Sequence, residues 1–153
     1  MSFFNRLSSL LTEAPAKVAA GPTDLQLAVG ALLVVASTRD DVFDAAEEIA
    51  IERILRERFD LSEEQTKMLL AAATGKAAAS LELFGFVRRI MQEMDEAERV
   101  KVIEMLWEVA YADGVLDAHE DSLIRRVAGL IYVSDRERAA ARRRAREKLG
   151  LDA

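Results

Sequence analysis

An acidic pattern, Asp-x-x-x-Asp-x-x-Glu, occurs twice in the sequence and is the part of the chain best suited to chemistry. The six carboxylates belong to Asp40, Asp44, Glu47, Asp113, Asp117 and Glu120. Ligation by oxygen atoms alone favours hard ions, so Ca²⁺, Mg²⁺ or Mn²⁺ suits these residues better than Zn²⁺. We therefore expect a divalent metal ion as cofactor, bound by these carboxylates.

Helix capping is a simpler interpretation of part of this pattern. An Asp followed three positions later by Glu forms a capping box at a helix start, and the helix dipole favours acidic residues in a first turn. Capping does not explain the first carboxylate of each copy, Asp40 or Asp113, which falls near the C-terminus of the preceding helix. Carboxylates held close together repel each other, and either protonation of one of them or a bound cation relieves the repulsion, of which the cation is the simpler solution for two copies at neutral pH. The position of this first Asp in both copies is therefore the main argument for a metal site.

Two neighbouring features limit the kind of site. The second copy has its glycine, Gly114, at the wrong position for an EF-hand calcium loop and is too short for one. His119 is the single histidine, and its counterpart in the first copy is Ala46. A site shared by both copies would therefore not use histidine.

The acidic pattern is part of a longer internal repeat. When residues 40–53 are aligned with residues 113–126, half of the positions are identical. The identical pairs are Asp40/Asp113, Val42/Val115, Asp44/Asp117, Ala45/Ala118, Glu47/Glu120, Ile51/Ile124 and Arg53/Arg126. Such a repeat predicts two similar structural units, which we place at residues 24–74 and 96–148. We expect the two acidic turns to face each other across a pseudo-twofold axis.

The composition and periodicity of the chain predict an all-α fold. Ala, Leu, Glu, Arg and Met, which are strong helix formers, dominate the sequence, and only two prolines occur. We expect a single domain of about seven to eight helices, in which the repeated units pack around two central apolar helices. The expected helices cover residues 3–13, 24–38, 45–59, 62–75, 80–93, 96–112, 118–131 and 134–148, and we expect Gly75 to end the fourth.

The chain divides into an N-terminal amphipathic helix with a loop, residues 1–23, and a helical domain, residues 24–153. The N-terminal helix carries its apolar residues on one side, and Arg6 is its single basic residue. One basic residue provides little attraction to an anionic membrane. We therefore expect this helix to pack on the domain or on another copy of the chain. Its apolar residues are Phe3, Phe4, Leu7, Leu10 and Leu11.

The sequence resembles the TerB-like family, whose members are related to a bacterial tellurite resistance protein. The resemblance covers most of residues 24–148. Its motifs are Val109-Ala-Tyr-Ala-Asp-Gly-Val-Leu-Asp-Ala-His-Glu120, Leu123-Ile-Arg-Arg-Val127 and the first copy of the acidic pattern, where Arg39-Asp-Asp41 replaces the Ala-Asp-Gly turn. The resemblance implies a bacterial stress-response protein, an all-helical fold, a metal site at the acidic positions and no enzymatic activity. Tellurite is an anion that six carboxylates would repel, so any role in resistance would be indirect.

Composition excludes several other classes of function. The 153 residues contain no cysteine and carry a net charge of −6, so thiol catalysis and cysteine-bound zinc are excluded and nucleic acid is not an expected partner. No apolar run is long enough to cross a membrane, and the N-terminus does not have the pattern of a signal peptide. We expect a cytoplasmic protein without stable membrane insertion.

Two alternative functions remain beside cation binding. The final helix, residues 134–148, is rich in arginine, and it forms either a solvated face or a surface for a protein partner or for self-association. A metal-independent interaction module is therefore the second hypothesis. A metal-dependent hydrolase is the third, although neither a nucleophile with a nearby base nor a phosphate-binding loop is present in the sequence.

Overall fold

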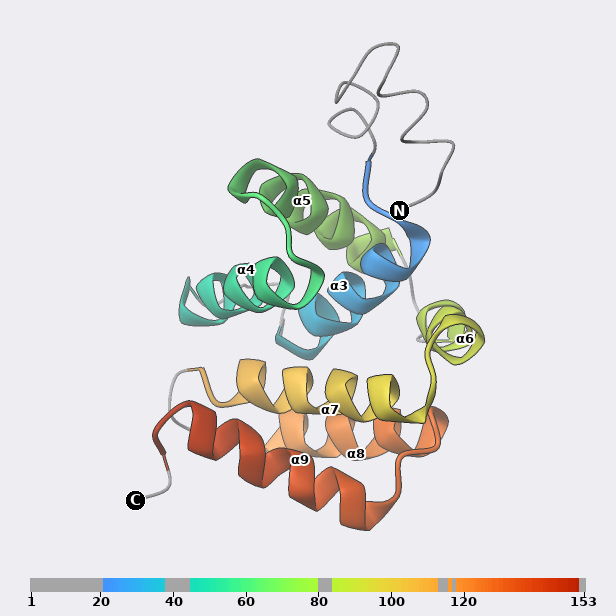
Figure 1. The fold of residues 1–153 in the computed structure, drawn as a ribbon, viewed down its shortest axis with the longest axis vertical. Helices are drawn as coiled ribbons and strands as arrows, with labels where there is room; N and C mark the ends of the chain where they lie inside the picture. The colour runs from blue at the N-terminus through green and yellow to red at the C-terminus, as the bar shows by residue number, and fades with distance from the viewer. Residues whose placement is uncertain (1–20, 38–44, 80–83, 113–115, 117, 152–153) are drawn as a thin grey trace.

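The computed structural model describes residues 21–37, 45–79, 84–112, 116 and 118–151, and all regular secondary structure within them is helical (Figure 1). This confirms the all-α prediction. The N-terminal helix expected at residues 3–13 lies outside the described residues. The helices are α3 (Asp24–Ser37), α4 (Ala45–Phe59), α5 (Glu63–Ala79), α6 (Phe84–Glu93), α7 (Glu96–Ala110), α8 (Ala118–Leu130) and α9 (Asp135–Lys148).

Reciprocal capping boxes begin four of these helices. In each box a Ser, Thr or Asp side chain accepts the backbone N–H three positions later, and a Gln or Glu side chain accepts the N–H of the capping residue. The pairs are Thr23 with Gln26 before α3, Ser62 with Gln65 before α5, Asp95 with Glu98 before α7 and Ser134 with Glu137 before α9. The separation in sequence between Thr23 and Asp95 equals the separation between Ser62 and Ser134. The two halves of the chain therefore have their capping boxes at matching positions.

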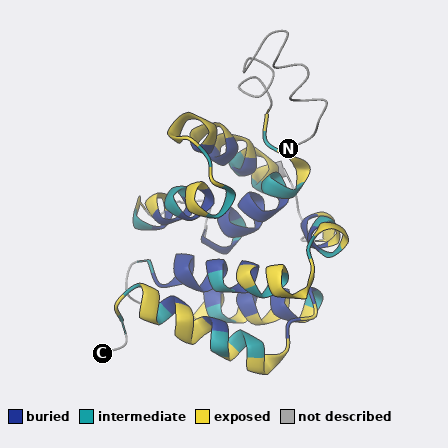
Figure 2. Cartoon of the chain, in the orientation of Figure 1, coloured by how far each residue is buried: buried dark blue, intermediate teal, exposed yellow. Residues whose placement is uncertain are grey.

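The apolar helices α3 and α7 lie at the centre of the molecule, as the sequence predicted. Leu32 and Leu33 of α3 and Leu106 and Trp107 of α7 are buried, and Figure 2 shows that exposed residues lie mainly on the surrounding helices. Helix α3 packs against α5, and α7 packs against α9. In addition α4 contacts α7, while α8 contacts α3. The packing is thus reciprocal between the halves, and the pseudo-twofold axis stays a prediction.

A glycine permits the close contact between α3 and α5. A Cβ atom added at Gly30 would lie 3.0 Å from the Cβ of Ala73, which is closer than ordinary van der Waals contact. Because glycine has no side chain, the two helix backbones approach here without a clash. This contact fixes how α5 covers the first central helix.

The expectation that Gly75 ends the fourth helix is wrong. Helix α5 continues through Gly75 to Ala79, and a Cβ at Gly75 would meet nothing within 4 Å. A glycine inside a helix costs only about 1 kcal/mol relative to alanine. The contact of α5 with α3 and the alanines that follow Gly75 outweigh that cost. No helix within the described ranges is long and apolar enough to cross a membrane.

Candidate functional site

Two of the six predicted metal ligands, Glu47 and Glu120, belong to the described residues. Each lies in the first turn of its helix, α4 or α8, and each is buried, with 7% and 6% of its surface exposed. Both also interact with other groups in the structure. Carboxylates are rarely buried unless they are paired or bind metal. The remaining four predicted ligands, Asp40, Asp44, Asp113 and Asp117, lie outside the described residues.

Ion pairs show how the helices that flank the acidic turns are oriented. Arg58 of α4 contacts Glu104 and Glu108 of α7, and Arg53, earlier in α4, contacts Glu108. The two helices are therefore antiparallel, so the start of α4 lies toward the end of α7. In Figure 1 the start of α4, the end of α7 and the start of α8 all lie at the left of the molecule. Three of the four described helix ends that border the two acidic segments thus lie on one side of the fold.

The described residues alone do not complete a metal site. Among them, no group of three or more histidine and acidic side chains is placed to hold an ion. His119 is exposed in the first turn of α8 and has an interaction partner. The shared site of six carboxylates therefore stays a prediction, and so does the expectation that the two acidic turns face each other.

A buried ion cluster on α7 was not predicted from the sequence. The Glu108 side chain is 0% exposed, and its carboxylate lies 3.2 Å from Arg58 Nη2, 3.5 Å from Lys148 Nζ and 3.8 Å from Arg53 Nη1. Glu108 Oε1 lies within ion-pair range of Lys148 and Arg53 but accepts no hydrogen bond from the described residues. Two cations within 4 Å therefore compensate the charge of that oxygen. The cluster joins α4 of the first half to α7 and α9 of the second.

The sequence did contain a signal for this cluster. Glu104 and Glu108 are spaced by one helical turn within an otherwise apolar stretch of α7, and such spacing puts both carboxylates on one face. Glu104 contacts Arg58 at 3.4 Å and Arg144 at 3.1 Å. A pair of acidic residues on a core helix requires cations from its neighbours.

Two arginines of α9 contact aromatic side chains at the end of α7, which the sequence did not predict. Arg142 donates from Nε to the Tyr111 hydroxyl at 2.6 Å, and its guanidinium lies over the rings of Trp107 and Tyr111. Arg146 lies over Tyr111 as well. These cation–π contacts hold α9 against the end of α7. Arg142 remains exposed and Arg146 is half-buried while they make these contacts, so the expected solvated or partner-binding face of α9 stays a prediction.

A cavity of about 260 Å³ opens between α3, α5 and α6. Arg89 at its rim contacts Asp24 at 3.6 Å and donates a hydrogen bond to Glu93 at 2.9 Å. The hydrogen bond to Glu93, helped by the charge of Asp24, raises the pKa of the Arg89 guanidinium above its ordinary value. Arginine is already protonated at physiological pH, so this shift introduces no pH dependence there.

Comparison with known proteins identifies the family. Residues 26–143 match the family model described as tellurite resistance protein TerB. The match includes both acidic copies and covers most of the chain. No curated protein and no solved structure gives a match.

Proposed function

Because the chain belongs to the TerB family, we propose that it is a non-enzymatic domain that binds a divalent cation. The ligands are Asp40, Asp44, Glu47, Asp113, Asp117 and Glu120. The observation that carries the proposal is the burial of Glu47 and Glu120 in the first turns of α4 and α8. These residues occupy equivalent places in the repeat, and both lie beside a turn that is rich in carboxylates.

Two structural relationships support a shared site. The antiparallel pairing of α4 with α7 brings the start of α4 toward the end of α7, from which the second acidic turn continues. The reciprocal contacts of α4 with α7 and of α8 with α3 agree with two related units. Oxygen ligands and a strongly negative neighbourhood favour Ca²⁺, Mg²⁺ or Mn²⁺ over softer ions.

The single tryptophan provides a direct measurement. Trp107 is buried near the end of α7 and stacks on Tyr111, shortly before the second acidic turn. After treatment with EDTA, the protein is titrated with Ca²⁺, Mg²⁺, Mn²⁺ or Zn²⁺ while tryptophan fluorescence and the melting temperature are recorded. An ion that binds only the folded state must raise the melting temperature. We expect one of the hard ions to do so and Zn²⁺ to be weaker.

Matched variants separate ligation from a general effect of charge. Glu47→Gln and Glu120→Gln remove buried carboxylates, whereas Glu48→Gln removes an exposed carboxylate from the same turn of α4. We expect the two buried variants to lose most of the ion-induced rise in melting temperature and Glu48→Gln to keep it. The absence of a rise with every ion in the unmodified protein, or an equal loss in Glu48→Gln, would show that the proposal is wrong.

A metal-independent interaction module is the second candidate function. It is favoured by Tyr132, whose aromatic side chain is 74% exposed and whose backbone has a φ of 57°. Tyrosine is common at protein interfaces, where its ring provides contact area at low entropic cost. For this function we expect association with a partner, or with a second copy, to be unchanged by EDTA and reduced by Tyr132→Ser.

The biological setting that fits both functions is a cytoplasmic stress response in bacteria. Tellurite itself is not the proposed ligand, because it is an anion and the acidic turns would repel it. A contribution to tellurite resistance would therefore be indirect, through the bound cation or through a protein partner.

A further inference from the structure

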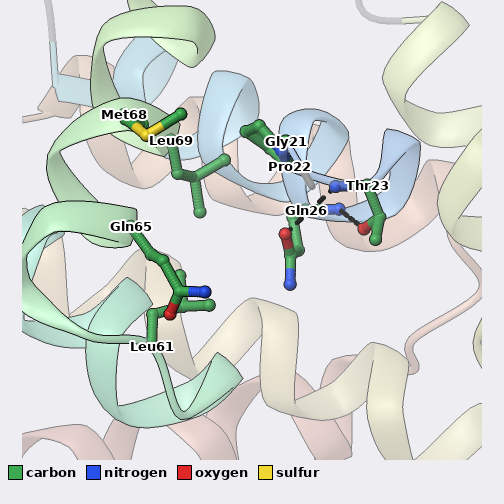
Figure 3. A pocket seen from close by; sticks show the side chains of 8 residues that line it. All are labelled: Gly21, Pro22, Thr23, Gln26, Leu61, Gln65, Met68 and Leu69. Carbon is green, nitrogen blue, oxygen red and sulfur yellow. Dashed lines mark hydrogen bonds between the residues drawn. The ribbon is translucent and has the colours of Figure 1, made fainter. Parts of the chain in front are cut away.

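A small pocket lies between the start of α3 and the first turns of α5, at the point where the described chain begins (Figure 3). Its volume is about 130 Å³, and Gly21 and Pro22 form part of its wall. An engineered cavity of about 150 Å³ in another protein binds benzene. The pocket is therefore of the size that accepts one aromatic side chain.

The floor of the pocket is apolar and partly uncovered. Leu61 and Leu69 line it, and Met68 beside them is 47% exposed. Methionine is flexible and polarisable, and its sulfur makes favourable contacts with aromatic rings. An aromatic ring in the pocket would cover apolar surface that is now exposed.

The rim supplies two unused hydrogen-bond donors. The Oε1 atoms of Gln26 and Gln65 accept the backbone N–H groups of Thr23 and Ser62, at 3.1 and 2.9 Å. These contacts commit the oxygen of each amide to a helix cap and leave its Nε2 group as a donor. Within the described part of the chain, neither Nε2 group donates a hydrogen bond. Two such donors beside an apolar floor suit a peptide, whose carbonyl groups accept while a side chain enters.

We propose that the pocket is the docking site for an aromatic side chain, Phe3 or Phe4, of the chain's own N-terminal segment. The sequence gives this segment an apolar side, and the chain leads to it directly from Gly21 at the pocket wall. With residues 5–13 helical and residues 14–20 extended, the connection spans up to roughly 35 Å, so the length of the chain allows the contact. No residue that lines the pocket belongs to the acidic pattern, and the proposal does not depend on the proposed cation binding.

Tethering favours the chain's own segment over that of a second copy. A short flexible connection gives an effective concentration in the millimolar range, which exceeds the concentration of a second copy in dilute solution. The N-terminal segments of the two copies are chemically identical, so the covalent connection to the pocket is what favours the chain's own segment as the occupant.

Engineered cysteines test this proposal cleanly, because the chain has none of its own. A variant with Asn5→Cys and Met68→Cys, which keeps both aromatic residues, is oxidised mildly and analysed by mass and by non-reducing electrophoresis. The matched control combines Asn5→Cys with Tyr132→Cys, which is more exposed than Met68 and does not line the pocket. We expect the first pair to form a disulfide within one chain several-fold faster than the control. Equal rates, or a disulfide between two chains, would overturn the proposal.

Oxidation of Met68 provides a second measurement without cysteine. The unmodified protein and a Phe3→Ser/Phe4→Ser variant are treated with peroxide, and sulfoxide formation is followed by mass spectrometry. We expect Met68 to be oxidised several-fold faster in the variant and the partly buried Met94 to be unchanged. Circular dichroism verifies that both proteins are equally folded. If Met68 is oxidised at the same rate in both proteins, the aromatic residues do not cover it and the proposal is wrong.

Discussion

Arg58 of α4 donates a hydrogen bond from Nη2 to Glu108 Oε2 of α7 at a distance of 3.2 Å. This contact connects the two halves of the molecule, and Lys148 adds α9 to the same buried carboxylate. A buried ion pair is weak evidence for a net gain in stability, because both charges lose their hydration. Once it is formed, however, the removal of one partner leaves the others uncompensated. The cluster is therefore expected to fix how α4 and α9 lie on α7.

The first prediction is that Glu108→Ala lowers the free energy of unfolding by about 3–5 kcal/mol, the range observed when one partner of a buried ion pair is lost. Urea denaturation measures this value. Glu147→Ala is the control, because it removes an exposed glutamate from α9, and we expect a change within about 0.5 kcal/mol. A similar small change for Glu108→Ala would mean that Arg53, Arg58 and Lys148 do not depend on this carboxylate.

The second prediction uses two glycines whose replacement by alanine has opposite effects. At Gly30 the new Cβ would lie 3.0 Å from Ala73, so Gly30→Ala is expected to destabilise the fold by about 1–3 kcal/mol through overpacking. At Gly75 it would meet nothing, so Gly75→Ala is expected to stabilise the fold by about 0.5–1 kcal/mol. Urea denaturation of both variants measures whether each free energy of unfolding falls or rises. If Gly30→Ala is also stabilising, α3 and α5 have room to separate.

The third prediction concerns the turn between α8 and α9. Tyr132 has a φ of 57°, and the Val133 N–H donates to the Ala128 carbonyl oxygen at 2.8 Å. Glycine is preferred at this left-handed position, where other residues cost about 1 kcal/mol or more. We expect Tyr132→Gly to raise the free energy of unfolding by about 1 kcal/mol, because the exposed ring loses little packing. Asp60→Gly, at a φ of 53°, should give a smaller rise, since Asp tolerates this region better. A decrease for Tyr132→Gly would show that the ring packs in solution.

Local patterns were sufficient to predict the helices that the structure describes, apart from the end of α5. The strong helix formers of the sequence indicated where the helices lie, and the apolar composition of α3 predicted its burial. The end of the fourth helix was predicted wrongly at Gly75 because the local propensity of glycine is opposed by a tertiary contact, the packing of α5 on α3. Propensity is a weak guide wherever packing decides whether a helix continues.

The candidate site was less predictable than the fold. The repeat identified Glu47 and Glu120 as equivalent residues, and the structure shows both buried. The pairing of Glu108 with Arg53 and Arg58 was missed because it connects residues far apart in sequence. Periodicity indicates which face of α7 carries Glu108, but it does not indicate which helix covers that face.

The last prediction separates metal ligands from helix caps in the acidic turns. Asp113→Asn and Asp40→Asn remove a charge that no cap requires, so each should abolish ion-induced stabilisation. The metal-free protein should keep its stability or gain some, because repulsion between carboxylates is reduced.

Asp117→Ala should behave differently, because the sequence places Asp117 at a helix start, where we expect it to act as N-cap as well as ligand. We expect it to lose the ion response and also to lower the free energy of unfolding of the metal-free protein by about 0.5–2 kcal/mol. Urea denaturation of Asp113→Asn, Asp40→Asn and Asp117→Ala, with and without the most stabilising ion, tests the distinction. If Asp113→Asn costs as much metal-free stability as Asp117→Ala, then Asp113 has a structural role. The position of the first carboxylate would then no longer argue for a bound cation.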